Sequence, residues 1–321
     1  MEPSGIEKRG VKSTSHNPFC ATINHIQLYR IRQVFQVRRR NSIGARAEES
    51  RMKFSEELET AKEAAHAACE VMEKYRHDGF EVESKGARTD FVTDADKEAQ
   101  EKVVEVIGDR FPKDGFLGEE SDLHPEGEER VWVIDPIDGT TNFVHGFPYY
   151  CVSVALRVDG ESQVGVVSAP ALGETYHAVR ENGAFSENGE SEEPLNVSKV
   201  SELSESLVAA DVSSWASETT NQHQLNIVDE LVGTPVSFRF PGASALELCH
   251  LGRGYFDGKI LVLAKPWDIA AGTLIVEEAG GSVRKRDSVV DGYVEVVASN
   301  GRVQEGLEEI FDRRVRNADG Q

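Results

Sequence analysis

The chain has only four cysteines among its 321 residues, no long apolar run and, over most of its length, few lysines. Cys20, Cys69, Cys151 and Cys249 are far apart and form no CxxC pair, which argues against a zinc ribbon, a thioredoxin-type site or a dense disulfide framework. A reducing cytoplasm is the simplest setting for such a chain. The apolar stretch 131–134 ends at an aspartate, far short of the roughly 18 apolar residues of a membrane span, so we expect no membrane partner.

Positive charge is scarce after the first 51 residues. The chain has 35 Lys and Arg against 56 Asp and Glu, and residues 1–51 hold 10 of the former but only 4 of the latter. The remainder is strongly acidic, and its field repels nucleic acid and anionic lipid, so we expect no nucleic-acid partner. Two explanations stay open for this composition: ordinary solubility, or a halophilic protein whose carboxylate-rich, lysine-poor surface stays hydrated in concentrated salt.

The composition divides the chain at about residue 51. Residues 1–51 are basic and rich in Ser and Asn, and three explanations remain open: a disordered extension, upstream sequence translated ahead of a true start at Met52, or a targeting peptide. Glu2, Glu7 and the lack of an apolar core weaken the last. Residues 52–321 contain no internal repeat and no long Pro/Gly/Ser linker, so we expect one continuous catalytic domain there.

Periodicity after residue 52 predicts a mixture of helices and strands. Helices are expected over 54–75, 95–107, 222–231, 243–251 and 268–279, with a last helix near the C-terminus. Strands are expected over 80–82, 131–134, 151–158, 164–169, 236–238, 259–263 and 294–298. This alternation predicts an α/β (α+β) sandwich of helices and mainly antiparallel sheets.

Two aspartates follow the apolar strand 131–134, in the segment 135–143 (DPIDGTTNF). We expect Pro136 to end the strand, so that Asp135 and Asp138 leave the sheet on the same side, while Gly139 allows close backbone approach to a bound group. Two carboxylates held close together repel unless a proton or a cation lies between them. Hard oxygen ligands in a partly open site suit Mg²⁺.

A helix that starts just after Gly139 would direct the backbone N–H groups of Gly139 and Thr140 toward a phosphate. A purely structural turn with capping Asp and Thr side chains is the alternative. Three further acidic groups are similarly ambiguous when taken singly: the pair after the short strand 116–118, and Asp96 and Asp268 near the starts of two helices. Their number favours a functional cluster.

Together these segments resemble the inositol monophosphatase family, the lithium-sensitive, magnesium-dependent phosphatase superfamily that includes fructose-1,6-bisphosphatases, and in particular its archaeal-type members. The matching segments, behind Lys85, are 90–96 (DFVTDAD), 118–121 (GEES), 135–143 (DPIDGTTNF), 183–185 (GAF), 242–246 (GASAL), 267–272 (WDIAAG) and 278–281 (EAGG). The resemblance covers the chain from about Met52 to the last helix. It implies a layered αβαβα sandwich and, commonly, a homodimer.

The resemblance implies a metal site of two to three Mg²⁺ ions. Its ligands are expected to be Glu119, Asp135, Asp138 and Asp268, with the carbonyl oxygen of Ile137 completing one ion's shell.

The resemblance also implies the roles of the reacting groups. Thr140, paired with Asp96 and helped by Glu119, would orient and deprotonate the water that attacks phosphorus in line, without a phosphoenzyme. Backbone N–H groups of Gly139 and Thr140 would hold phosphate oxygens, and Asp268 would also border the substrate.

Substrate choice is less determined by the sequence. Members that prefer inositol phosphates usually carry a glutamate several residues before the Trp-Asp element, but the stretch 260–265 (ILVLAK) has none. Arg239 and Ser244 are expected to meet the distal part of the substrate, although a surface or intersubunit salt bridge is an alternative for Arg239. Lys85 is either part of a mobile loop over the third metal or a solvated surface lysine.

We therefore expect a cytoplasmic, Mg²⁺-dependent phosphomonoesterase for small phosphorylated polyols or sugars, with inositol-1-phosphate and fructose-1,6-bisphosphate as first candidates. A 3'-phosphoadenosine-5'-phosphate or NADP phosphatase is the alternative within the enzyme class. A catalytically silent regulatory subunit is the alternative outside it. All four metal-ligand positions and Thr140 are present, which argues against a silent subunit.

Overall fold

The computed structural model describes residues 53–78, 82–84, 91–120, 128–189, 191–212, 218–288 and 290–316. Residues 50–321 form one compact unit. The extension predicted for residues 1–51, and Lys85 with its expected loop, lie outside the described residues, so those expectations stay predictions.

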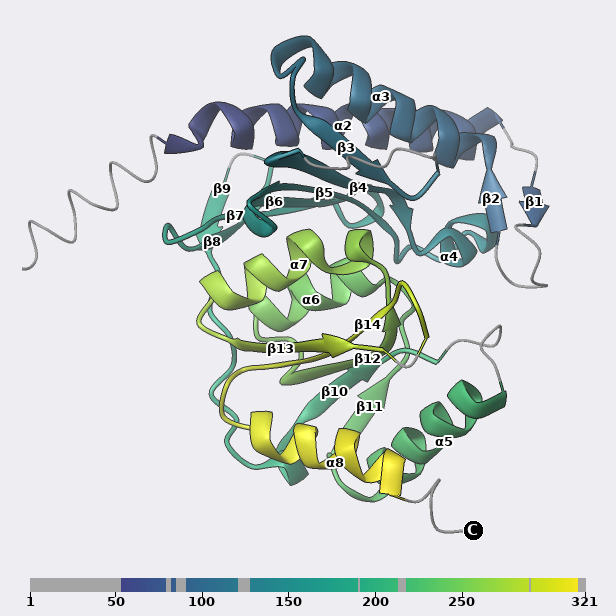
Figure 1. Cartoon of the computed structure of the whole chain (residues 1–321), viewed down its shortest axis with the longest axis vertical. Coiled ribbons are helices and arrows are strands. Elements are labelled where there is room, and N and C mark those ends of the chain that lie inside the picture. The colour runs from purple at the N-terminus through teal and green to yellow at the C-terminus, as the bar shows by residue number, and fades with distance from the viewer. Residues whose placement is uncertain are drawn as a thin grey trace, which may run out of the picture. The chain divides into compact units, whose positions relative to one another are not determined.

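Helices and sheets of this unit alternate in five layers (Figure 1). Helices α2 and α3 cover one face of the first sheet, α6 and α7 lie between the two sheets, and α5 and α8 cover the outer face of the second. The expected αβαβα sandwich is confirmed. Among the described residues, no helix is both long enough and apolar enough to cross a membrane.

The bounds of the elements are as follows. The helices are α2 (Ser55–Asp78), α3 (Asp94–Arg110), α4 (Thr140–His145), α5 (Glu218–Gly233), α6 (Ser244–Gly252), α7 (Pro266–Glu278) and α8 (Gln304–Arg316), with 3₁₀ turns η1 (Pro170–Leu172) and η2 (Leu203–Glu205). The strands are β1 (Val82–Ser84), β2 (Phe91–Thr93), β3 (Gly115–Gly118), β4 (Arg130–Asp138), β5 (Cys151–Val158), β6 (Glu161–Ala169), β7 (Glu174–Val179), β8 (Ala184–Asn188), β9 (Ser191–Pro194), β10 (Leu207–Ala210), β11 (Ser237–Arg239), β12 (Gly258–Ala264), β13 (Ser282–Asp287) and β14 (Val294–Ser299).

Strand pairing is mainly antiparallel, as expected. The first sheet has the order β3-β4-β5-β6-β7-β8-β9, and only β3 and β4 are parallel in it. The second has the order β11-β10-β12-β14-β13, in which β10 runs parallel to both its neighbours. Strands β1 and β2 form a separate antiparallel pair.

Four apolar clusters hold these layers together. Trp132 belongs to the cluster between α2, α3 and the first sheet, and Leu246 and Ile275 to the one between that sheet and α6/α7. Leu261 lies in the cluster between α6/α7 and the second sheet, and Phe311 in the outermost one. Because apolar side chains fill both faces of each sheet, the strand ends that carry polar residues are held in place by dense packing.

The predicted elements agree with the structure in type, with ends that differ by a few residues. Six strands of the described residues have no counterpart among the predicted ranges: β2, β7, β8, β9, β10 and β13. Strand β13 has the sequence SVRKRD, and it lies at the edge of the second sheet with several side chains exposed. An edge strand that faces solvent needs no apolar alternation, so periodicity gave no signal for it.

Candidate active site

A β-bulge at the end of β4 turns two aspartates to the same side. Asp135 pairs with Ser153 and Asp138 pairs with Cys151, so β4 has one residue more than β5 between these pairs. Side chains three positions apart on a regular strand point to opposite faces, and the extra residue cancels this alternation. The shared side of Asp135 and Asp138 therefore comes from the bulge.

Pro136 does not end the strand, contrary to the expectation from the sequence. Strand β4 continues to Asp138, and the proline lies inside the bulge, beyond the last residue of β4 that pairs with β3, Ile134. A proline is tolerated there because a bulge removes the need for its missing N–H group. The N–H of Ile137 donates to Asp135 Oδ1 at 3.1 Å, which fixes that carboxylate against its own turn.

Asp138 caps helix α6 from a distant part of the chain. The N–H of Ser244 donates to its Oδ1 at 3.0 Å and the N–H of Ala245 to its Oδ2 at 2.7 Å. Burial raises the pKa of Asp138 to about 6, although these hydrogen bonds oppose the shift. The positive end of α6 thus partly offsets the cost of placing a carboxylate in the interior.

Asp268 lies in the first turn of α7, as its third residue and not as its N-cap. Its Oδ2 accepts a hydrogen bond of 2.7 Å from the N–H of Lys265. Burial raises the pKa of Asp268 well above its usual range, and the charges of Glu119 and Asp138 add to this. The capping role and a role in an acidic cluster therefore coexist in this residue.

Five acidic side chains come together from four parts of the sequence. Burial raises the pKa of Asp135 strongly, and the charges of Glu119, Asp138, Asp268 and Asp96 raise it further, in that order. Such mutual repulsion is costly in a folded protein unless protons or cations are bound. The arrangement is therefore suited to binding positive charge.

Thr140 stands beside this cluster at the start of α4. Its Oγ1 lies 2.9 Å from the carbonyl oxygen of Ile137 and 3.3 Å from Oδ1 of the fully buried Asp96, so its single proton can be donated to either. Gly139 precedes it with a φ of 89°, in the left-handed region that glycine adopts without strain. The predicted pairing of Thr140 with Asp96 is present in this geometry.

The two residues predicted to contact the distal part of the substrate, Arg239 and Ser244, differ in their position relative to the acidic cluster. Arg239 ends β11 with an exposed side chain, and its guanidinium donates to Ser237 Oγ and to the carbonyl oxygen of Phe238. The hydroxyl of Ser244 donates to Asp211 Oδ2 at 2.6 Å. Ser244 therefore borders the acidic cluster, whereas Arg239 bonds within its own strand.

The sequence reasoning missed a network of charged residues next to the cluster. Lys259 Nζ donates to Asp211 Oδ1 at 2.7 Å and also contacts Glu247 Oε2, and both Lys259 and Glu247 are fully buried. Burial lowers the pKa of Lys259, but the two carboxylates raise it more, so the net shift is upward. The signal in the sequence was a single lysine inside the otherwise apolar strand 258–264.

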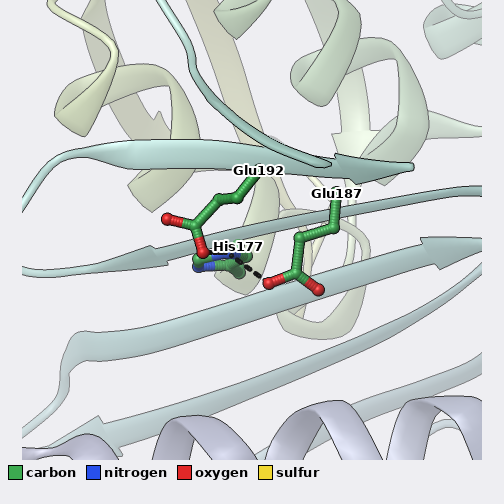
Figure 2. Close-up of side chains that lie close together, drawn as sticks. All are labelled: His177, Glu187 and Glu192. Atoms are coloured by element: carbon green, nitrogen blue, oxygen red, sulfur yellow. Dashed lines mark ion pairs between the residues drawn. The ribbon is translucent and has the colours of Figure 1, made fainter. Parts of the chain in front are cut away.

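A second group of ionisable side chains lies on the first sheet, far along the sequence from the aspartates. His177 Nε2 of β7 lies 3.1 Å from Glu187 Oε1 of β8 and 3.8 Å from Glu192 Oε2 of β9 (Figure 2). Lys62 of α2 also forms an ion pair with Glu187. Because Lys62 already supplies a positive charge there, we interpret this group as an ion-pair network between strands and helix.

The chain is similar to known phosphatases over most of its length. The model of the inositol monophosphatase family matches residues 53–316. An inositol monophosphatase of Dictyostelium discoideum is 39% identical over 217 residues, which cover 66% of this chain and 78% of that protein. A histidinol-phosphatase of Chlorobaculum parvum is 39% identical over 249 residues, 76% of this chain and 92% of that one.

Solved structures share the fold as well. The inositol monophosphatase of Thermotoga maritima superposes with a TM-score of 0.70 at 32% identity, and the match covers 83% of this chain and 98% of that one. A structure described as an inositol monophosphatase and NADP phosphatase complexed with Mg²⁺ and phosphate has a TM-score of 0.64 at 26% identity, and covers 75% of this chain and 89% of that one.

Proposed function

The chain belongs to the inositol monophosphatase family of metal-dependent phosphatases, and from this premise we propose that it hydrolyses small phosphorylated polyols or sugars with Mg²⁺. The observation that carries the proposal is the convergence of Glu119, Asp135, Asp138 and Asp268, whose charges act on one another. A site that gathers so many carboxylates and leaves part of them accessible calls for divalent cations.

The donor set fits Mg²⁺. Carboxylate oxygens and a backbone carbonyl are the ligands that this ion prefers. Burial, with the charges of neighbouring acids added, raises the pKa values of Asp135 and Asp138, and a bound cation would favour their ionised forms. We propose Glu119, Asp135, Asp138, Asp268 and the carbonyl oxygen of Ile137 as the ligands of two to three ions. When bound, Mg²⁺ would supply a nucleophilic water at neutral pH and neutralise charge on the phosphate.

The chain's own residues orient the reactants. The hydroxyl of Thr140, within 3.3 Å of Asp96 Oδ1, is placed to hold the attacking water and pass its proton to the Asp96 carboxylate, helped by Glu119. The N–H groups of Gly139 and Thr140, at the start of α4, are proposed to hold phosphate oxygens. Because attack comes directly from water, no phosphoenzyme forms.

Inositol-1-phosphate and fructose-1,6-bisphosphate remain the first substrate candidates. Ser244 borders the acidic cluster through its bond to Asp138, and we keep both Ser244 and Arg239 as candidate contacts to the distal part of the substrate. Histidinol phosphate is a second candidate, because a histidinol-phosphatase matches this chain at 39% identity over 92% of its own length. NADP and 3'-phosphoadenosine-5'-phosphate are the nucleotide alternatives.

We propose a cytoplasmic homodimer. The buried Cys69, Cys151 and Cys249 are free thiols, which suits a reducing compartment. Sedimentation of the purified chain would test the dimer directly, with a single species at the monomer mass as the contrary result.

The proposed function is tested by measuring phosphate release with Mg²⁺, at low and at multimolar KCl. The five substrates are inositol-1-phosphate, fructose-1,6-bisphosphate, histidinol phosphate, NADP and 3'-phosphoadenosine-5'-phosphate. We expect release from at least one substrate, abolished by EDTA. Highest kcat/KM for inositol-1-phosphate or fructose-1,6-bisphosphate supports the polyol and sugar class, and highest kcat/KM for a nucleotide or for histidinol phosphate replaces it. No release from any of the five contradicts the proposal.

A further inference from the structure

The charged network beside the acidic cluster places one carboxylate at a distinctive position. Asp211 directly follows β10, and its N–H donates to the carbonyl oxygen of Ile260 on β12 at 3.2 Å. Its side chain accepts hydrogen bonds from Lys259 Nζ on one oxygen and from Ser244 Oγ on the other. Two donors from different elements therefore fix the orientation of this carboxylate.

Asp211 is the accessible member of the network. The side chains of Lys259 and Glu247 are 0% exposed, whereas that of Asp211 is 26% exposed. A buried lysine and glutamate cannot touch a substrate, but the hydrogen bond from Lys259 Nζ can hold the partly exposed Asp211 carboxylate in a fixed orientation. Each oxygen of a carboxylate has two lone pairs, so each oxygen of Asp211 has capacity for a second hydrogen bond.

Ser244 links Asp211 to the proposed metal ligands. Its hydroxyl donates to Asp211 while its N–H donates to Asp138 Oδ1, so one residue connects the two carboxylates. The charge of Asp211 also contributes to the raised pKa values of Asp138 and Asp268. A substrate whose phosphate is held at the cluster would therefore have its carbon skeleton within reach of Asp211.

The neighbouring strand β12 has no acidic side chain, so Asp211 at the end of β10 supplies the carboxylate in this part of the second sheet. The stretch 260–265 holds only apolar residues and a lysine, so β12 offers no carboxylate to a substrate here. Ala210, which precedes Asp211, pairs with Ile260 at the start of that stretch. An acid absent from β12 is thus present one strand away, at the end of β10.

We propose that Asp211 is a specificity-determining residue whose carboxylate accepts a hydrogen bond from a hydroxyl group of the phosphorylated polyol. The inference rests on the proposed function, because it assumes that the phosphate is held by the adjacent acidic cluster. It assigns to Asp211 the recognition of the carbon skeleton, separate from the binding of the phosphate.

The test compares the wild-type chain with Asp211→Asn on three monoesters: inositol-1-phosphate, which offers hydroxyls, histidinol phosphate, which offers an ammonium group, and 4-nitrophenyl phosphate, which offers neither. The amide keeps its oxygen for Lys259 and can donate to Ser244 Oγ, so the fold is expected to survive. Asp229→Asn, a change on an exposed position of α5, is the matched control. Calorimetric titration with Mg²⁺ alone serves as a readout independent of turnover.

We expect Asp211→Asn to lower kcat/KM for inositol-1-phosphate by about 10-fold or more, as loss of a hydrogen bond to a charged acceptor does. The value for 4-nitrophenyl phosphate should stay within about 3-fold, since that substrate makes no such bond. Mg²⁺ affinity should fall by less than the kcat/KM for inositol-1-phosphate, because Asp211 acts on the proposed ligands only through its charge. Equal losses on inositol-1-phosphate and 4-nitrophenyl phosphate, a loss of Mg²⁺ affinity as large as the loss of kcat/KM, or no loss on either substrate would overturn the proposal. A loss confined to histidinol phosphate would overturn it too, by showing that the donor is an ammonium group. Failure of the wild-type chain on all three substrates would instead contradict the proposed function.

Discussion

Lys259 shows how strongly a single residue can constrain this fold. Its ammonium group is fully buried between Asp211 and Glu247, and burial raises the pKa of Glu247 to about 8, with the charge of Asp211 adding to the rise. Removing the lysine leaves the Asp211 carboxylate without its counter-charge and Glu247 Oε2 without its hydrogen-bond donor. Breaking a buried pair in this way costs far more than forming it contributes.

Lys259→Met is therefore expected to lower the free energy of unfolding by about 3–5 kcal/mol. Urea unfolding followed by circular dichroism measures the change, and Lys113→Met, at an exposed position, is the control. A loss no larger than that of the control would show that the buried contacts of Lys259 contribute no more to stability than an exposed lysine does.

His250 adds a pH dependence to stability. Burial lowers its pKa to about 4, and the ring is packed among Tyr149, Tyr176, Tyr255 and Phe256. The unfolded chain, with an ordinary histidine pKa near 6.5, binds more protons than the folded one between pH 6.5 and 4. The neutral form thus stabilises the fold fully above pH 6.5, and this contribution is lost as pH falls toward 4.

His250→Gln should remove this contribution, so that the melting temperature of the variant relative to the wild-type chain rises as pH falls from 6.5 to 4. The difference between the two proteins corresponds to at most about 3 kcal/mol across this window. Parallel curves for variant and wild type, offset but equal in slope, would show that His250 does not titrate in that range.

At the scale of elements, the turn from β4 into α4 sets the positions of both aspartates and of Thr140. Gly139 has a φ of 89°, and a Cβ atom there would lie 3.1 Å from Ala243 Cβ, from the carbonyl oxygen of Gly242 and from that of Tyr149. A side chain at this position must push α4 away from the segment that precedes α6. The proposed metal ligand Asp138 and the proposed catalytic Thr140 flank this glycine.

Gly139→Ala is expected to lower kcat by about 10-fold or more, because displacements near 1 Å in a reacting site have effects of that size or larger. Gly160→Ala is the matched control, since Gly160 has a φ of 82° and nothing within 4 Å of its Cβ position. Both variants carry the backbone cost of a left-handed alanine, so any further loss in Gly139→Ala reports the steric contacts at that position. Equal kcat in the two variants would contradict the steric argument.

The sequence predicted this region in part. Consecutive apolar residues ended by two aspartates identified the strand and the acids, and the order of the motifs identified the family and its layered fold. The bulge was not predictable, because Pro136 signals the end of a strand as readily as a bulge. Asp211 was not predicted either, since a single acid after a short apolar stretch is ordinary, and its significance depends on Lys259 from a neighbouring strand.

At the scale of the whole molecule, the balance between acids and cations governs stability. The raised pKa values of Asp135, Asp138 and Asp268 mean that the metal-free folded chain holds more protons than the unfolded chain just above pH 4. These three carboxylates therefore contribute stability that falls as pH rises from about 4 through the pKa of Asp138 near 6, a trend opposite in sign to the contribution of His250. Mg²⁺ competes with these protons for the same oxygens.

Mg²⁺ is thus expected to raise the melting temperature more at pH 7.5 than at pH 5.5. Thermal unfolding of chelated and Mg²⁺-loaded protein at both pH values measures this difference, and comparison at equal ionic strength separates it from screening of the acidic surface. An equal or smaller shift at pH 7.5 would contradict proton–metal competition at these carboxylates.

The acidic composition also leads to a prediction about salt. If the chain is halophilic, folding and activity should be half-maximal only well above about 0.2 M KCl, because screening relieves repulsion among its 56 carboxylates. Half-maximal values below that concentration would favour ordinary solubility as the explanation.

The central claim is that the acidic cluster is a metal-dependent catalytic site. The most direct test compares phosphate release by Asp135→Asn and by the wild-type chain, with Mg²⁺ and with EDTA. Asp159→Asn, a change in an exposed turn, is the control. The account predicts that release needs Mg²⁺, stops with EDTA, and falls by about 100-fold or more in Asp135→Asn while the control retains it. Release that survives EDTA, or that Asp135→Asn leaves unchanged, would contradict it.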